Sequence, residues 1–447
     1  MSKTIPEPVN YFHGFSGGLM MPLDPGMERV IGGAARNHGL PFPFGPDRGA
    51  QHAQPHRPIR SASNGARRGR TAPFSRHEKP PNAGPMTARD SKPTQQGPWV
   101  DIDLGALCAN YVMIQEAAPD AEVAPAVKCD AYGLGMAPIA RALAAQAKCR
   151  SFFVVYPEEG AALRAALKDG APRIYCFAGP TRETLPLFEN AALTPALNSL
   201  EQAKLWTDHM PGVDAAIHID TGMNRLGAPA SALAAIAALK GLKATLVMSH
   251  LACASEPAHP KNKIQREKFI AAAAHFPGAR LSLAASAGAL MGKYYQFDMV
   301  RPGIALYGGS PFDNDDPSIR PVAALRAPIL QVRNLPAGET VGYGATFTAR
   351  APTRIATVAL GYGDGFPRAA EGKGAAVVNG ERAPVAGRVS MDFVTLDVTA
   401  LKNPPKEGDI AEFFGPGLRL HDAAAATGRV AYDLLTGLGG RVDRRYV

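Results

Sequence analysis

Lys128 is the residue whose type and position first suggest chemistry in this sequence. It ends the apolar run 123–128, and a loop with two glycines, Gly133 and Gly135, follows it. A lysine where a buried strand opens into such a loop is well placed to form a Schiff base with a carbonyl cofactor. A lysine after a strand is more often a solvated loop residue. The interpretation therefore depends on whether the chain also has residues that could bind the phosphate and the pyridine nitrogen of such a cofactor, and residues that could transfer a proton.

Other polar residues stand at corresponding positions of later apolar runs. They are Asp220 and Arg225 after the run 214–219, His250 at the end of 245–250, Ser286 at the end of 281–286, and Arg301 at the end of 298–301. Each one alone is better explained by an ordinary role, such as a core histidine or a surface ion pair. If the runs are parallel strands of a barrel, however, their carboxyl ends all open onto one rim, where the active sites of barrel enzymes lie.

The elements that would position these residues alternate from Trp99 onward between short apolar runs and alanine-rich helical stretches. This pattern is typical of βα units around a parallel sheet. The eight runs are 123–128, 152–156, 173–177, 194–197, 214–219, 245–250, 281–286 and 298–301. Helices are expected between them, including 136–147 and 158–168, the second ending at Gly170. Eight repeats over about 220 residues have the size of a (β/α)8 TIM barrel, which we predict for residues 98–322.

The rest of the chain predicts two further regions. After residue 322, β-branched runs are broken by Gly, Pro and Asn-Gly, which indicates an all-β domain over 323–447 with a hairpin at Asn379-Gly380. Residues 1–97 hold 14 of the 40 prolines and show no sustained apolar periodicity, which predicts a disordered extension. The expected fold class is therefore α/β, a TIM barrel followed by a C-terminal all-β domain, with a disordered N-terminal extension.

Charge and composition exclude several classes of partner. Residues 1–97 hold 13 Lys and Arg against 6 Asp and Glu, so +7 of the formal charge of +9 belongs to the extension and the folded part is nearly neutral. We therefore expect no nucleic-acid partner. No run approaches the roughly 20 apolar residues of a membrane span, and no apolar segment follows Arg67-Arg68-Gly69-Arg70, so we expect a cytoplasmic protein without a membrane partner. The five cysteines form no C-x-x-C pair and no metal-ligand spacing, which predicts a reduced protein with no metal.

Six motifs, in their order along the chain, resemble those of the alanine racemases. They lie at 126–133, 220–227, 300–308, 342–346, 361–365 and 388–392, and the resemblance spans residues 98–447. It implies a pyridoxal 5'-phosphate enzyme with an N-terminal barrel and a C-terminal β domain. The implied reaction is the interconversion of L-alanine and D-alanine by a two-base mechanism, which would supply D-alanine for peptidoglycan. It also implies a homodimer with shared active sites.

The resemblance assigns a role to each candidate residue. Lys128 would bind the cofactor covalently and serve as one catalytic base, and Tyr343 of the partner subunit would be the other. Bases on opposite faces of the substrate α-carbon would let a proton leave one face and return on the other, which makes a dimer necessary for catalysis. Arg225 and the backbone N–H of the partner's Met391 would hold the substrate carboxylate. The cofactor contacts would be Lys128, Tyr132, His250, Ser286, Arg301, Gly303, Ile304 and Tyr432.

Arg301 carries the most specific chemical implication. The resemblance places it against the pyridine nitrogen, where many pyridoxal enzymes have a carboxylate. A guanidinium stays protonated and cannot accept the ring proton, so the ring is a weaker electron sink, which suits racemisation better than transamination. His250 would link Arg301 to Tyr343 by hydrogen bonds. The hydroxyls of Ser286 and Tyr432, and the amides of Gly303 and Ile304, would hold the phosphate.

Two positions depart from the family pattern. His218 stands where many members carry a lysine modified to a carbamate, and Ala285 stands where asparagine is common. A histidine cannot form that anionic carbamate, so Arg225 would need another anion to orient it, such as a carboxylate or chloride. Both departures could loosen substrate selectivity.

Three alternatives remain open at this point. A broad-specificity amino-acid racemase would share the fold and mechanism and act on longer substrates such as lysine or arginine. A non-catalytic pyridoxal-phosphate carrier would share the barrel lysine, although such proteins resemble a single barrel without the β domain that bears Tyr343. A basic amino-acid decarboxylase would need a carboxylate where this chain has Arg301.

Overall fold

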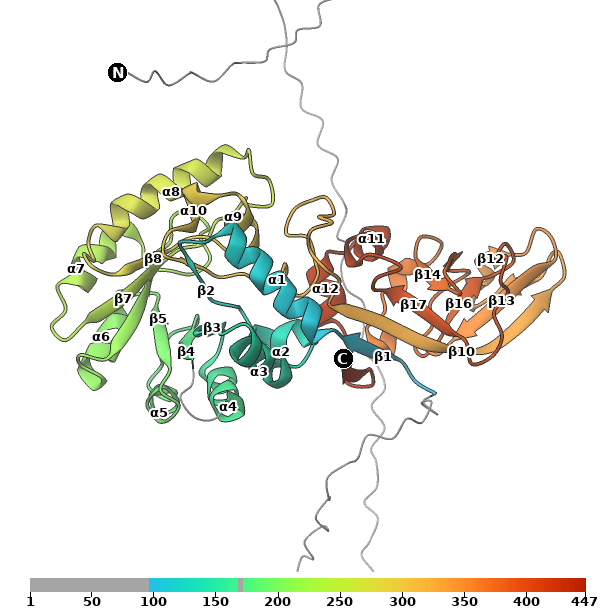
Figure 1. Ribbon diagram of the computed structural model, residues 1–447, viewed down its shortest axis with the longest axis horizontal. Coiled ribbons are helices and arrows are strands. Elements are labelled where there is room, and N and C mark those ends of the chain that lie inside the picture. Colours follow the sequence, from blue (N-terminus) through green and yellow to red (C-terminus); the bar gives the residue numbers. More distant parts are fainter. Residues whose placement is uncertain (1–95, 168–171) are drawn as a thin grey trace, which may run out of the picture. The chain divides into compact units, whose positions relative to one another are not determined.

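The computed structural model describes residues 96–167 and 172–447 (Figure 1). The predicted disordered extension lies almost wholly outside these residues, as does the helix end expected at Gly170. The described residues all belong to one compact unit, which holds both the barrel and the β sheet.

Eight short strands form the barrel, one for each run that the sequence predicted. They are β2 (Glu122–Val123), β3 (Ser151–Val154), β4 (Arg173–Cys176), β5 (Thr194–Leu197), β6 (Asp214–His218), β7 (Lys243–Met248), β8 (Arg280–Ser282) and β9 (Met299–Val300). Strands β3 to β8 form a parallel sheet in sequence order, and β2 pairs with β9 in parallel. Backbone hydrogen bonds join these sheets, among them one from Val127 N to the Phe153 carbonyl and one from Asp298 N to the Leu281 carbonyl. The predicted barrel is thereby confirmed.

The barrel interior is a packed core. The rings of Phe153 and Tyr175 stack there with their centroids 4.6 Å apart. Alanines from neighbouring strands, among them Ala126, Ala196 and Ala216, leave room for these rings. Because parallel strands are covered on both faces, they read as continuous apolar runs in the sequence, which is why their positions could be predicted.

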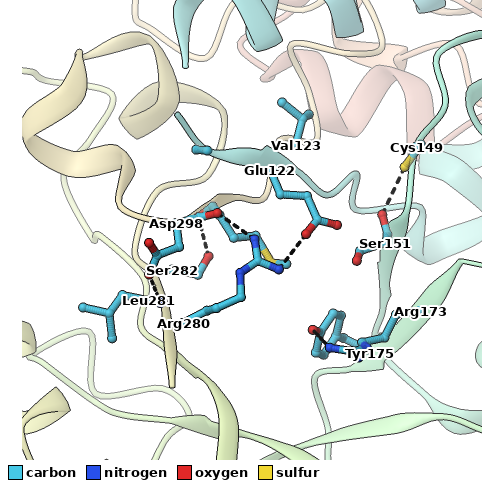
Figure 2. Close-up of polar contacts among 12 residues, drawn as sticks. Glu122, Val123, Cys149, Ser151, Arg173, Tyr175, Arg280, Leu281, Ser282 and Asp298 are labelled. Atoms are coloured by element: carbon cyan, nitrogen blue, oxygen red, sulfur yellow. Dashed lines mark hydrogen bonds and ion pairs between the residues drawn. The ribbon is translucent and has the colours of Figure 1, made fainter. Parts of the chain in front are cut away.

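Polar contacts tie the strands together at the N-terminal end of the barrel, where β8 meets β9 and β2 (Figure 2). Arg280 pairs with Glu122 at 2.6 Å and donates to the carbonyl oxygen of Asp298 at 2.8 Å. The Asp298 carboxylate in turn accepts from the amide of Leu281 at 2.7 Å. These contacts lie at the end opposite the strand-to-helix loops, where side chains of this fold usually serve stability.

Helices lie around the barrel, and side chains cap the first residues of some of them. They are α1 (Leu104–Ala117), α2 (Lys128–Gly133), α3 (Met136–Gln146), α4 (Pro157–Leu167), α5 (Leu185–Asn190), α6 (Leu200–His209), α7 (Leu233–Ala237), α8 (Pro260–Ala273), α9 (Ser286–Leu290) and α10 (Lys293–Gln296). Asp103 caps α1 by accepting from the amide of Ala106 at 2.8 Å. Within the described residues, no helix combines the length and apolarity that crossing a membrane requires.

The C-terminal region is built on a second sheet. Its strands are β1 (Trp99–Ile102), β10 (Ala323–Leu335), β13 (Thr353–Val358), β14 (Ala375–Val378), β15 (Glu381–Pro384), β16 (Val394–Asp397), β17 (Ile410–Phe414) and β18 (Asp443–Tyr446). Two shorter strands, β11 (Thr340–Val341) and β12 (Phe347–Thr348), pair with each other, and two helices, α11 (Leu420–Ala426) and α12 (Ala431–Thr436), follow β17. The hairpin expected at Asn379-Gly380 joins β14 to β15, with φ of 50° and 82° at its two central residues.

Strand β1 joins this C-terminal sheet although it precedes the barrel in the sequence. It pairs antiparallel with β10, beside which it is labelled in Figure 1, and parallel with β18. Its residues fall inside the range 98–322 that we predicted for the barrel. The chain therefore enters the β sheet, builds the barrel, and returns to the same sheet. The exact domain limits stay a prediction.

Candidate active site

A cavity of about 600 Å³ opens where the barrel strands end. Nine of the candidate residues line it: Lys128, Tyr132, Arg225, His250, Ser286, Arg301, Gly303, Ile304 and Tyr432. Tyr343 and Met391 do not line it, and their side chains are 73% and 54% exposed on the β region. The structure thus brings together every residue to which the resemblance gave a role within one subunit, whereas Asp220, also expected on the rim, does not line the cavity. The two candidates assigned to a partner subunit lie on the surface of this chain.

Lys128 enters the cavity from a left-handed backbone turn. The four residues after it, Cys129, Asp130, Ala131 and Tyr132, have φ between 52° and 58°. Residues with a Cβ adopt this conformation at a cost of about 1–2 kcal/mol each. A run of four is therefore strained, and strain of this kind persists only where surrounding contacts hold it, often at functional sites.

Contacts from two distant elements hold this turn. Glu159, near the start of α4, accepts from the amide of Cys129 at 2.7 Å and from two amides of its own loop at 2.8 and 3.2 Å. Tyr446, in β18, donates to the carbonyl oxygen of Leu134 at 3.0 Å. The Tyr446 hydroxyl lies so close to Gly135 that an added Cβ there would be 1.9 Å from it. The last strand of the chain thus helps to fix the segment that presents Lys128.

The environment of the cavity lowers the pKa of the Lys128 amine. Desolvation is the largest cause, and the nearby Arg225 adds to it, while Cys129 and Glu159 act in the opposite direction. Among the described residues, Lys128 Nζ makes no hydrogen bond or ion pair. A desolvated amine without a counter-ion is neutral more often, and a neutral amine can act as a nucleophile or a base.

The ionisable side chains that surround Lys128 give the cavity a positive charge. No Asp or Glu occurs among the described residues that line it. Burial lowers the pKa of Arg301 to about 9, which leaves the guanidinium protonated at neutral pH. Desolvation, followed by the charges of Arg301 and Arg225, lowers the pKa of His250 to about 3, so that imidazole is neutral. Such a cavity attracts anions, including phosphates and carboxylates.

Arg301 is fixed at the inner wall of the cavity. Its side chain is 3% exposed, one Nη donates to the hydroxyl of Ser282, and the other donates to the carbonyl oxygen of Ser249 at 2.5 Å. The guanidinium also lies 5.9 Å from the ring centroid of Phe153. The ring of His250 makes no hydrogen bond among the described residues, so its expected link between Arg301 and Tyr343 stays a prediction.

The residues expected to hold a phosphate form a small group of donors. Ser286 Oγ accepts from the amides of Gly303 and Ala305 at 2.9 and 3.3 Å, so the Gly303 amide is already engaged. The amide of Ile304 has no partner among the described residues, although this residue is only 1% exposed. A buried donor without an acceptor costs about 1–3 kcal/mol, and an anionic oxygen would satisfy it. An added Cβ at Gly303 would lie 2.1 Å from the hydroxyl of Tyr132, so that ring would have to move to admit a larger residue.

The sequence did not reveal which residues support the candidate side chains. Glu159 and Tyr446, which hold the turn, carried no signal. Asn198 directly follows β5, and the rule that singled out the other strand-end residues would have found it. Asn198 Oδ1 lies 2.7 Å from Nδ1 of His218, which is 6% exposed and also lines the cavity. Burial, with Arg301 and Arg225 nearby, lowers the pKa of His218 to about 4.

Comparison with known proteins places both regions of the chain in one family. The model of the alanine racemase N-terminal domain matches residues 102–311, and that of the alanine racemase C-terminal domain matches residues 322–446. The catabolic alanine racemase of Agrobacterium fabrum is 44% identical over 77% of this chain and 91% of its own length. The alanine racemase of Methylobacterium sp. strain 4-46 is 42% identical over 78% and 98%.

Solved structures show the same relationship. The alanine racemase from Bartonella henselae with covalently bound pyridoxal phosphate is 34% identical, with a TM-score of 0.74 over 78% of this chain and 99% of that one. The biosynthetic alanine racemase from Pseudomonas aeruginosa is 33% identical, with a TM-score of 0.74 over 79% and 100%.

Proposed function

Because this chain belongs to the alanine racemase family, we propose that it is an isomerase that interconverts L-alanine and D-alanine with pyridoxal 5'-phosphate. One observation carries this proposal: a lysine with a lowered pKa projects from a strained turn into a cavity whose charged side chains are cations. The proposed role is the supply of D-alanine for peptidoglycan.

The residues that line the cavity fit the proposed cofactor. The amine of Lys128 would hold the aldehyde carbon, Arg301 would face the ring nitrogen, and Ser286, Ile304 and Tyr432 would bind the phosphate. When bound, the cofactor withdraws electrons from the substrate α-carbon and makes its proton more acidic. Arg301 remains protonated and cannot take up the ring proton, which limits that withdrawal and favours return of the proton to the carbon.

Two bases on opposite faces of the substrate would account for racemisation. Lys128 would exchange a proton at one face of the α-carbon through Nζ. Tyr343 of the partner subunit would do so at the other face through its hydroxyl. The exposure of this tyrosine on its own chain supports a contribution to a neighbouring subunit. The proposed enzyme is therefore a homodimer, in which Arg225 and the main-chain amide of the partner's Met391 bind the substrate carboxylate.

The assignment of Lys128 is tested with the full chain supplied with pyridoxal phosphate. We expect D-alanine to form from L-alanine, and Lys128→Ala to abolish both this activity and the visible absorbance of a lysine-linked cofactor. Lys263→Ala is the matched control, because Lys263 is an exposed lysine of α8 outside the cavity. Lysine-linked cofactor in the Lys128→Ala variant would show that the assignment is wrong.

The role of Tyr343 is tested by comparing α-proton exchange from the two enantiomers of alanine. Tyr343→Phe should slow α-proton exchange with deuterated solvent from L-alanine more than from D-alanine, since a base on one face serves one enantiomer. Tyr294→Phe, an exposed tyrosine on α10, is the control. Equal slowing for both enantiomers would remove Tyr343 as a one-sided base.

A broad-specificity racemase is the second candidate. The observation that favours it is a cavity wall of small side chains, which includes Ala252, Ala254 and Ala285. Such a wall leaves room for a side chain longer than a methyl group. Racemisation of L-lysine or L-arginine at a kcat/KM equal to that for L-alanine would support this candidate. The carrier and decarboxylase alternatives lose support, because the family models match both regions and because Arg301 stands where a decarboxylase needs a carboxylate.

A further inference from the structure

Arg225 reaches the cavity without a partner that would orient it. Its side chain is exposed, and it makes no hydrogen bond or ion pair with the described residues. The nearest acid in its own loop is Asp220, whose carboxylate accepts from loop amides at 2.9 to 3.1 Å and so holds the loop backbone. An arginine that binds a planar carboxylate through paired hydrogen bonds needs a defined orientation. His218 also lines the cavity, and none of the described residues makes a hydrogen bond with its Nε2.

The contacts of Asn198 fix the protonation of His218, which lines the same cavity. The amide nitrogen of Asn198 donates to the carbonyl oxygens of Phe177 at 2.9 Å and Ala196 at 2.8 Å. Because acceptors surround this nitrogen, the atom of Asn198 that faces His218 is Oδ1, at 2.7 Å from Nδ1. Oδ1 can only accept, so Nδ1 of His218 carries the hydrogen. In the neutral imidazole, Nε2 then keeps a lone pair and is an acceptor.

We propose that His218 is a positioning residue: when the carboxylate of the amino-acid substrate draws the Arg225 guanidinium into the cavity, Nε2 of His218 accepts a hydrogen bond from it and fixes its orientation. This inference rests on the proposed function. A neutral acceptor has a specific advantage at this place: it orients the guanidinium without neutralising it. Arg225 then keeps its full positive charge for the substrate carboxylate.

The groups around His218 keep its imidazole neutral. Arg225 and Asp220 lie in the loop after β6 and Arg301 lies in the segment after β9, and their charges act on His218. The charge of His218 acts in turn on His250, which follows β7. Burial lowers the pKa of His218 most, the two arginines lower it further, and Asp220 alone acts against them. Nε2 therefore remains an acceptor throughout the neutral pH range.

The first test removes and restores the acceptor. His218→Ala should raise KM for L-alanine about tenfold with kcat within about twofold, since a lost hydrogen bond to a charged group is worth at least the 1.4 kcal/mol of a tenfold change. His218→Gln keeps a neutral acceptor oxygen and should return KM to within about threefold of the wild type. The absorbance of the lysine-linked cofactor should be the same in all three proteins.

A binding measurement separates this inference from the proposed function. Acetate, a carboxylate without an amino group, is titrated calorimetrically into the cofactor-loaded full chain. We expect its dissociation constant to rise about tenfold in His218→Ala, as for KM. A protein that binds acetate in this way but forms no D-alanine would refute the racemase proposal and leave the role of His218 standing. Unchanged acetate affinity in His218→Ala would refute the role of His218 whether or not the protein racemises alanine.

The second test converts Nε2 of His218 from a hydrogen-bond acceptor into a donor. In Asn198→Asp, a carboxylate faces Nδ1 and stabilises the protonated imidazole, whose Nε2 then becomes a donor. The acid limb of the kcat/KM profile should therefore move to higher pH by about one unit or more, and a double variant with His218→Gln should show no such shift. A histidine that only fills space would not produce this pattern. An unmoved acid limb, or a wild-type KM that depends on chloride, would overturn the proposal, since a bound anion would then orient Arg225.

Discussion

Glu159→Gln probes how the left-handed turn after Lys128 is maintained. Both carboxylate oxygens of Glu159 accept from main-chain amides: Oε1 from Cys129 at 2.7 Å, and Oε2 from Val155 and Tyr156 at 2.8 and 3.2 Å. A glutamine has one acceptor oxygen and one amide nitrogen. Whichever way it is turned, its nitrogen faces an N–H group, and at least one contact is lost.

The expected magnitude follows from the geometry of the turn. Four consecutive residues in the left-handed region cost about 4–8 kcal/mol together. The hydrogen bond from Cys129 to the Glu159 carboxylate offsets about 1.5–3 kcal/mol of this, and partial exposure favours the lower end. Losing about 1.5–2.5 kcal/mol of support for the conformation that presents Lys128 should weaken cofactor binding by roughly 10- to 70-fold.

The assay is a titration of pyridoxal phosphate into the apoprotein, followed by the absorbance of the lysine-linked form. Glu158→Gln is the matched control, because Glu158 is the adjacent exposed carboxylate of α4 and makes no hydrogen bond with the described residues. The charge change is the same in both variants, and both residues lie in the first turn of α4. Equal cofactor affinity in the two variants would refute the idea that the Glu159 carboxylate holds the turn.

Three further outcomes are expected. Gly303→Ala should weaken cofactor binding with little change in thermal stability, because the alanine Cβ would lie 2.1 Å from the Tyr132 hydroxyl and displace that ring. An unchanged cofactor affinity would contradict this prediction. The pKa values of His218 and His250 are lowered from 6.5 to about 4 and about 3, so the folded state binds fewer protons than the unfolded state below pH 6.5. The free energy of unfolding should therefore fall as pH decreases from 6.5 toward 4, by up to about 1.4 kcal/mol per pH unit for each histidine. Denaturant titrations that give the same free energy of unfolding across this pH range would refute the prediction. Tyr446→Phe removes the hydrogen bond to the carbonyl oxygen of Leu134. The variant should bind the cofactor less tightly, by about 0.5–1.5 kcal/mol, which the absorbance at limiting cofactor measures.

The sequence alone determined the order of βα units, the Asn379-Gly380 hairpin and the rim on which the candidate residues lie. These features depend on local patterns. Strands buried on both faces are apolar runs, a two-residue turn with positive φ favours Asn-Gly, and parallel strands present their carboxyl ends at one edge. The placement of Lys128, His250 and Arg301 in one cavity therefore followed from their positions along the chain.

The tertiary structure alone decided how these residues are held. Strand β1 pairs with β18 from the far end of the chain, Tyr446 reaches the turn after Lys128, and Asn198 fixes the protonation of His218. Each of these contacts joins segments that no local pattern relates. A left-handed turn of four non-glycine residues is also unfavourable by its local propensity, so no sequence rule predicts it, and only contacts from distant segments make it the stable conformation.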